Sequence, residues 1–401
     1  MFVKTKKQLI EERGAKMNEN SIKMLFLCLA SSFKEAPLSE EEKSLYTEDA
    51  INELLSTAKE HDITQLVYKG LYENGLVPDT DSSYKNSIFK TIFRYENQNY
   101  ELNRVRSLLE KNEIPFLPLK GSVLRNYYKE PWLRTSCDID ILIKKDDLEK
   151  AKNLIIKELN YECTFVSTHD VSLMSQNRVH LELHFELMEP DFKKSTLLSD
   201  VWNGDELIKA SDYEYQMTNE LFLFFHIYHM AKHLKYGGCG IKPLIDLWVI
   251  RNKMSYDEKK VIKLLKDEDL EKFYEYTLLL TDAWLEGKSH NDVTKSMECF
   301  ILQGGVYGTF EQNLAMEQGA KGGAFRRMWG RVFMPYSQMI KGYPVLKNWP
   351  ILFPLFQVVR WFRIIFGAGR KRAIEEMKSN QSVTQAEREM AKSLIDELGL
   401  R

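Results

Sequence analysis

Two aspartates separated by a single residue, Asp138 and Asp140, carry the clearest chemical signal in the chain. They alternate with isoleucines in the segment DIDILI, which predicts a strand with both carboxylates on one face and the isoleucines in a core. Two carboxylates about 7 Å apart along a strand can hold one or two divalent cations. Because Asp-x-Asp also occurs at ordinary strand ends, the surrounding residues decide its interpretation.

The residues just before this strand offer an anion-binding turn. The apolar run from Phe116 to Leu119 predicts a short buried strand, and Lys120, Gly121 and Ser122 predict a tight turn that opens a helix. A glycine lets the backbone approach an anion closely, and free N–H groups at a helix start favour phosphate. One segment therefore offers both halves of a site for a metal and a nucleotide.

A third acidic residue lies on another alternating segment, VHLELHFEL, which begins at Val179. The alternation predicts a strand with apolar residues on one side and His180, Glu182, His184 and Glu186 on the other. Phosphoryl transfer with two metal ions needs an acid in addition to the Asp-x-Asp pair. An acid on this second strand can supply it.

These motifs resemble those of the nucleotidyltransferase superfamily that includes DNA polymerase beta, and most closely an uncharacterised bacterial nucleotidyltransferase family within it. The matching residues are Lys120, Gly121, Ser122, Arg134, Asp138 and Asp140. The resemblance implies that Asp138, Asp140 and Glu182 are catalytic residues that bind Mg²⁺, for which Mn²⁺ can substitute. At the position of Glu182 the family more often has aspartate, but glutamate also coordinates Mg²⁺.

The resemblance also implies that a nucleoside triphosphate is the substrate and that Lys120, Gly121, Ser122 and Arg134 bind it. Each has a structural alternative: Ser122 is also a suitable helix N-cap, Lys120 a surface lysine, and Arg134 half of a surface ion pair. The hydroxyl of Ser122 is expected to contact the β- and γ-phosphates.

Several histidines accompany the acidic residues. His184 matches a histidine of the family's strand motif and is expected either to orient a carboxylate or to be a satisfied core histidine. His226, His229 and His233 lie at helical spacing on one face. Three imidazoles on one face can bind zinc. The resemblance implies instead that they line the nucleotide or acceptor cleft together with Asp246, because the family has similar helix histidines followed by the helix that carries Asp246.

Composition sets limits on the protein class. With 401 residues, 44% of them hydrophobic, the chain can bury a sizeable core in two or three packed units. A net charge of −2 argues against a general nucleic-acid binder. The five scattered cysteines indicate neither a disulfide framework nor a zinc site and favour the cytoplasm, and no signal peptide or membrane span is evident.

The order of the expected elements predicts an α+β fold. We expect an N-terminal helical region (1–100), a nucleotidyltransferase core with a small mixed sheet (101–195), a helical domain (196–310) and a C-terminal aromatic and basic helical region (311–401). Asp62 is expected to cap a helix, and a polar loop is expected after residue 166. We also expect a mobile connection over Gln312–Gly323 and, in the tail from Ala373 to Arg401, an amphipathic helix that ends at Gly399.

The stretch 344–372 is aromatic, basic and interrupted by prolines. We favour the interpretation that Trp349, Phe353, Phe356, Trp361, Phe362 and Phe366 form the core of a helical cap. The alternative is peripheral contact with anionic lipid, with Arg360, Arg363, Arg370, Lys371 and Arg372 facing the membrane.

The expected activity is transfer of a nucleoside monophosphate from an NTP to an unidentified acceptor, with release of pyrophosphate. One alternative is an Asp-x-Asp glycosyltransferase that uses a sugar nucleotide, although such enzymes carry a run of βα units before the motif and this chain is helical there. The other is a non-catalytic binding protein on the same fold.

Overall fold

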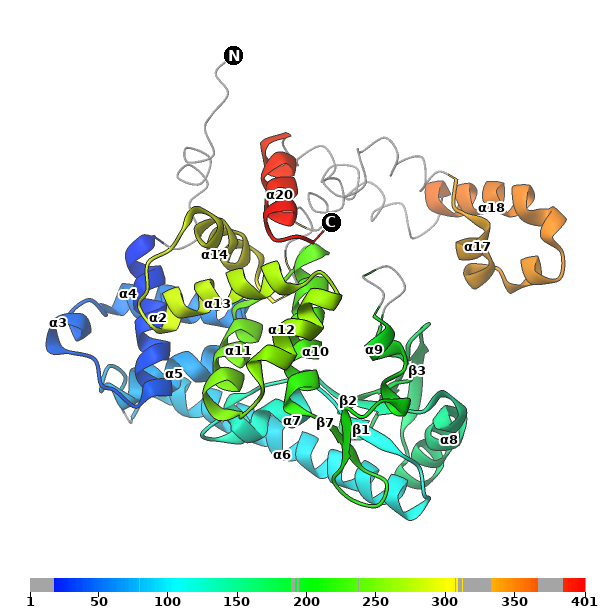
Figure 1. The fold of residues 1–401 in the computed structure, drawn as a ribbon, viewed down its shortest axis with the longest axis horizontal. Helices are drawn as coiled ribbons and strands as arrows, with labels where there is room; N and C mark the ends of the chain where they lie inside the picture. The colour runs from blue at the N-terminus through cyan, green and yellow to red at the C-terminus, as the bar shows by residue number, and fades with distance from the viewer. Residues whose placement is uncertain are drawn as a thin grey trace.

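The computed structural model describes residues 18–78, 80–188, 192, 195–236, 238–306, 308, 312, 333–366 and 385–400. Helices surround one mixed five-stranded sheet, which confirms the predicted α+β class (Figure 1). The division into four regions remains a prediction.

Among the described residues before the sheet there are five helices. They are α2 (Glu19–Lys34), α3 (Glu40–Lys43), α4 (Glu48–Glu60), α5 (Thr64–Glu73) and the 30-residue α6 (Ser82–Lys111). The side chains of Asn18, Ser39, Thr47 and Asp81 accept backbone N–H bonds at four of the helix starts, as short polar N-caps do. The predicted cap at Asp62 is wrong, because α5 starts after Ile63 and has no side-chain cap.

The sheet has the strand order β1-β2-β5-β4-β3. Its strands are β1 (Phe116–Pro118), β2 (Asp138–Ile143), β3 (Glu162–Val166), β4 (Asp170–Met174) and β5 (His180–His184). Strands β2 and β5 are parallel, and the other pairs are antiparallel. The connections contain α7 (Gly121–Leu124), short 3-10 turns at Arg125–Tyr127, Pro131–Leu133 and Lys145–Asp147, and α8 (Leu148–Leu159).

Strand β4 corrects the prediction of a polar loop after residue 166. Its sequence, DVSLM, places Asp170 and Ser172 on one face and Val171 and Leu173 on the other, and all four are buried. The polar face is shielded from water by the rest of the fold, which the short segment could not reveal. Pairing between β3 on one side and β5 on the other makes it a strand.

One face of the sheet packs on α6 and α8. Ile139, Ile141 and Ile143 of β2 are fully buried and belong to one apolar cluster with Val105 of α6 and Ile155 of α8. The isoleucines therefore point into a core as predicted. The opposite face carries the acidic residues.

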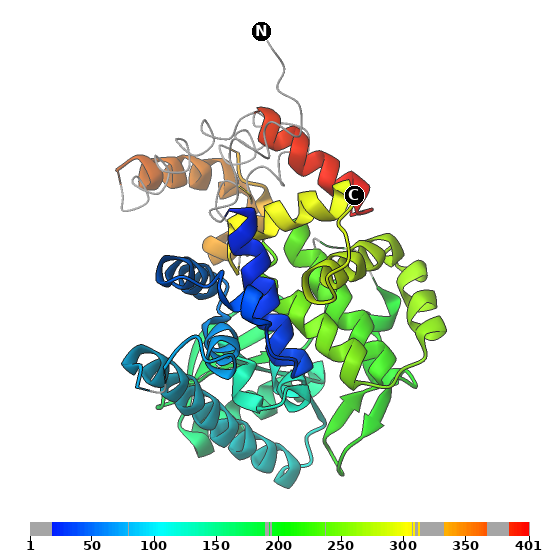
Figure 2. The same ribbon diagram turned by 90° about the vertical axis from the view of Figure 1, so that its left-hand side faces the viewer.

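A second helical group follows the sheet and packs against the N-terminal helices. It contains α9 (Thr196–Ser199), a 3-10 turn (Val201–Asn203), the hairpin β6 (Leu207–Lys209) and β7 (Tyr215–Met217), α10 (Asn219–Lys235), α11 (Ile241–Lys253), α12 (Glu258–Asp267), α13 (Glu271–Leu285) and α14 (Asp292–Gly304). Figure 2 shows α2 lying across this group, where Phe26 of α2 stacks on Trp284 of α13 with ring centroids 4.2 Å apart. Residues distant in sequence thus share one core.

The described C-terminal part contains α17 (Tyr336–Gly342), 3-10 turns at Pro344–Lys347 and Pro350–Leu352, α18 (Phe353–Phe366) and α20 (Gln385–Glu397). The favoured core interpretation is wrong for Trp349 and Phe362, which are 62% and 61% exposed. Phe353 and Trp361 instead contact aromatic rings of the same segment, those of Tyr336 and Phe333.

Parts of the C-terminal predictions lie outside the described residues. These are 313–323 of the expected connection, 370–372 of the basic run and 373–384 of the expected tail helix. Contact of 344–372 with lipid remains a prediction. Among the described residues, no helix is both long and apolar enough to cross a bilayer.

Candidate active site

The two acidic strands meet in register at the centre of the sheet. Residues of β2 and β5 pair as Asp138 with His180 and Asp140 with Glu182, while His184 lies two positions further along β5. Because side chains at alternate positions of paired strands share a face, all five side chains lie on the face opposite the isoleucine core. The geometry expected for the three acids is therefore present.

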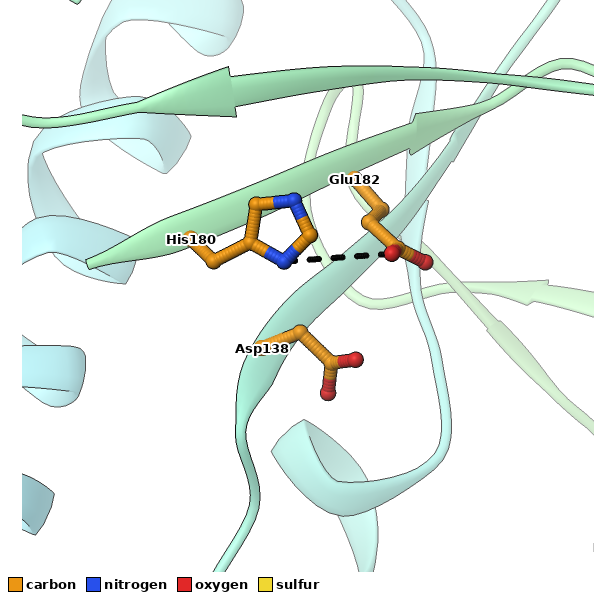
Figure 3. Close-up of side chains that lie close together, drawn as sticks. All are labelled: Asp138, His180 and Glu182. Atoms are coloured by element: carbon orange, nitrogen blue, oxygen red, sulfur yellow. Dashed lines mark ion pairs between the residues drawn. The ribbon is translucent and has the colours of Figure 1, made fainter. Parts of the chain in front are cut away.

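The side chains on this face contact one another directly. Oδ1 of the buried Asp140 lies 2.9 Å from Nζ of Lys120 and 2.9 Å from Nε2 of His184. The same His184 nitrogen lies 3.3 Å from Oε2 of Glu182, and Nδ1 of His180 lies 3.8 Å from Oε1 of Glu182. Figure 3 shows Asp138, His180 and Glu182 with their side chains directed toward one another.

The charges in this cluster shift one another's ionisation. Burial raises the pKa of Asp138, and the neighbouring charge of Asp140 raises it further. Burial opposes the charge of Asp140 as well, but Lys120 and His184 outweigh it and hold the Asp140 pKa well below its usual range. Burial lowers the Lys120 pKa, and the three carboxylates more than restore it. The site is thus a concentration of negative charge balanced by one lysine.

Lys120 reaches the cluster through an unusual backbone conformation. It precedes α7 with φ 45° and ψ −118°, a region that residues with a side chain rarely adopt. Such conformations cost about 1–3 kcal/mol and persist where the surroundings impose them, often at functional sites. Gly121 follows in close packing, since a Cβ there would lie 3.1 Å from Cβ of Ser136.

Ser122 differs from its expected position. Its side chain is 4% exposed, its hydroxyl oxygen has no hydrogen-bond partner among the described residues, and it does not line the cavity beside the carboxylates. The N-cap alternative is wrong, because the N-cap of α7 is Lys120, without a side-chain bond, whereas the contact of Ser122 with phosphate stays a prediction. Since α7 has only four residues and a small dipole, phosphate binding here would depend mainly on Lys120.

A cavity of about 390 Å³ opens beside the carboxylates, between the sheet and helices α10 and α11. The residues proposed as its lining, His184, His226, His229, His233 and Asp246, all border it. Lys120, Gly121, Arg134 and the three acids border it too. The sheet, the two helices and the residues around Asp62 thus border the cavity together.

Arg134 is engaged within the protein. Its Nε donates to both carboxylate oxygens of Asp246, at 2.7 and 2.9 Å, and the Tyr128 hydroxyl donates to the same carboxylate at 2.7 Å. Burial raises the pKa of Asp246, but Arg134 outweighs this and lowers it. The pair is buried rather than on the surface, and it joins α11 to the loop that precedes β2.

The histidines of α10 do not form one group. Nε2 of His226 lies 2.8 Å from the carbonyl oxygen of Pro243, whereas Nε2 of His229 and Nε2 of His233 lie 3.1 Å apart. Burial and the charge of Lys120 hold the pKa of His229 well below its usual value. Among the described residues, no potential metal-binding group contains these three.

The cavity also has residues that the sequence analysis missed. Lys242 of α11 donates to Asp62 and, at 2.9 Å, to the hydroxyl of Thr135, and all three border the cavity. His169, in the loop before β4, borders it next to His184, with ring centroids 6.2 Å apart. Since Asp62 and Lys242 are 180 positions apart, no local motif could have indicated their contact.

The comparisons with known proteins agree with this geometry. The model of a family described as uncharacterised nucleotidyltransferase matches residues 47–286, which include the sheet, both acidic strands and helices α10 and α11. No curated protein shows a significant match.

Proposed function

Since the chain belongs to the uncharacterised nucleotidyltransferase family, we propose that it transfers a nucleoside monophosphate from an NTP to an acceptor hydroxyl or similar nucleophile. In this reaction the acceptor oxygen forms a bond to the α-phosphorus, the bond between the α- and β-phosphates breaks, and pyrophosphate leaves. The acceptor's proton passes to solvent or to a basic group of the site. The reaction requires a divalent cation, either Mg²⁺ or Mn²⁺ in its place.

The observation that carries the proposal is the register pairing of Asp140 with Glu182, which places a third acid beside the Asp-x-Asp motif. The donor set fits a cation, because ligand atoms of Asp138 and Glu182, and of Asp140 and Glu182, lie within 4.8 Å of one another. One or two divalent cations, when bound, supply charge neutralisation at the α-phosphate and a lowered pKa for the acceptor.

The remaining residues receive roles from their positions. Lys120 borders the cavity with its ammonium beside the acids, so it can turn to the triphosphate once a cation neutralises them. Gly121 lets the triphosphate approach the turn closely, whereas Ser122 must move before its hydroxyl contacts phosphate. Arg134 holds Asp246 and contributes positive potential to the cavity.

The experiment uses an NTP labelled in the α-phosphate, Mg²⁺ or Mn²⁺, and an extract of the host as the source of acceptor. We expect the label on an acceptor and unlabelled pyrophosphate in solution, and neither product with Asp140→Asn. Release of a nucleoside diphosphate from a sugar nucleotide would indicate the glycosyltransferase instead. Absence of any cation-dependent turnover with each of the four NTPs would support the non-catalytic alternative.

A further inference from the structure

Histidine nitrogens face the same space as the three acids. The structure brings together two overlapping sets of potential ligands, Asp138 with His180 and Glu182, and Asp140 with Glu182 and His184. Within each set the ligand atoms lie within 4.8 Å of one another, and Glu182 belongs to both. Each candidate cation position therefore contains one imidazole in addition to carboxylates.

The environment of His180 suits a ligand rather than a structural residue. Its side chain is 28% exposed, and no hydrogen bond joins its ring to any described residue. Its nearest charged partner is Glu182, at 3.8 Å, which exceeds hydrogen-bond length. Nonetheless the ring points to the space between Asp138 and Glu182 (Figure 3).

The presence of imidazole bears on which cation the site takes. Mg²⁺ prefers oxygen ligands and retains several waters. Imidazole nitrogen binds Zn²⁺ and Fe²⁺ more strongly than Mn²⁺, and it binds Mn²⁺ more strongly than Mg²⁺. A site built only for Mg²⁺ gains nothing from two histidines. Two histidines on the same face as three acids, one of them without a hydrogen bond, therefore indicate a transition metal.

We propose that the protein binds a divalent first-row transition metal ion in preference to Mg²⁺, with His180 and His184 as ligands beside the carboxylates. This inference rests on the proposed function in that it uses the same acidic residues. It changes the identity of the cation and adds two ligands.

The two positions are not equivalent. A cation between Asp140, Glu182 and His184 must displace Lys120, whose ammonium lies 2.9 Å from Asp140. It must also displace the contacts that His184 makes with both acids. The position at Asp138 and His180 carries no such contact with Lys120, so we expect it to be filled first.

The test is a titration of the purified full-length protein with Mn²⁺, in which electron paramagnetic resonance measures free aqueous Mn²⁺. We expect Mn²⁺ to bind at least about tenfold more tightly than Mg²⁺ in competition. Pulsed measurements on the bound Mn²⁺ are expected to show coupling to a ¹⁴N nucleus. Equal affinities, or bound Mn²⁺ without ¹⁴N coupling, would overturn the proposal, and this readout needs no variant.

The variant His180→Gln tests the ligand directly. It is expected to weaken Mn²⁺ binding about tenfold or more, with loss of the ¹⁴N signal of the tighter position, while Mg²⁺ affinity changes less than about threefold. His169→Gln is the matched control, because His169 borders the same cavity but belongs to neither ligand set. Unchanged Mn²⁺ affinity in His180→Gln, or an equal loss in both variants, would contradict the assignment.

The outcome separates this inference from the proposed function. Mn²⁺ binding with ¹⁴N coupling but no nucleotidyl transfer would uphold the metal site and refute the reaction. Nucleotidyl transfer with Mg²⁺ alone, and no ¹⁴N coupling to bound Mn²⁺, would uphold the reaction and refute the histidine ligands.

Discussion

The ammonium of Lys120 lies 2.9 Å from Oδ1 of Asp140, and the aspartate side chain is only 4% exposed. The charges of Asp138 and Glu182 stabilise the same ammonium. Lys120 therefore acts as an internal cation for the acidic face. Its backbone, with φ 45°, is held in a conformation that aims the side chain there.

The variant Lys120→Met removes this internal cation. We expect divalent cation affinity to rise roughly tenfold, because the ammonium of Lys120, 2.9 Å from Asp140, repels a cation bound by the carboxylates. We expect the KM for NTP to rise as well if Lys120 binds the triphosphate. Isothermal titration with Mn²⁺ and the α-labelled transfer assay measure the two effects.

Lys145→Met is the control for charge alone, since Lys145 is 71% exposed and pairs with Glu186 on the surface. It should change neither quantity by more than about twofold. A fall in cation affinity in Lys120→Met would show that Lys120 organises the carboxylates rather than competing with the cation.

Glu182→Gln removes the acid on β5 with little change in shape. We expect nucleotidyl transfer to fall at least about 100-fold. Loss of a metal ligand should reduce activity more than loss of a residue that only hydrogen-bonds to a ligand. Thermal unfolding should shift little, since the side chain is 23% exposed and the oxygen of glutamine can still accept from His184. Glu186→Gln, an exposed acid beyond the end of the same strand, should retain activity.

Asp246→Asn tests the buried ion pair between Asp246 of α11 and Arg134 in the loop that precedes β2. The asparagine can still accept from Tyr128, but Arg134, with its side chain 12% exposed, would be left as an uncompensated charge. We expect a loss of about 3–5 kcal/mol in the free energy of unfolding, measured by urea denaturation. The control Glu186→Gln removes a surface ion pair and should lose less than about 1 kcal/mol in the free energy of unfolding. A similarly small loss in Asp246→Asn would show that Arg134 finds another partner.

Glu298 of α14 gives a pH-dependent contribution to stability. Burial raises its pKa, but His290, Lys295 and Trp284 outweigh burial and lower it to about 2. Since the folded pKa lies below the unfolded one, the contribution is complete above about pH 4.5 and is lost as the pH falls toward 2. Glu298→Gln should cost about 2–3 kcal/mol at pH 7.

Denaturant unfolding at several pH values checks this sign. The difference between the native protein and Glu298→Gln should shrink as the pH drops below 4.5. Glu275→Gln, an exposed acid on α13, is the control and should match the native protein at each pH. A difference that stays constant or grows toward low pH would refute the assignment.

Local patterns in the sequence determined the parts of the fold that carry chemistry. The alternation around Asp138 and Asp140 and around Glu182 predicted two strands with acids on one face, because side chains of a strand alternate regardless of what surrounds them. The helix Leu148–Leu159 also depends on local features, because its apolar spacing and its acidic first turn favour a helix regardless of what packs against it.

Only the tertiary structure decided which residues meet. It pairs Asp140 with Glu182 in register, joins Arg134 to Asp246 across 112 positions and Lys242 to Asp62 across 180, and buries Ser122 away from the cavity. It also makes a strand of residues 170–174, in which the polar side chains of Asp170 and Ser172 are buried. These contacts depend on how helices and strands pack against one another. A local sequence pattern does not indicate which distant residue a side chain will contact.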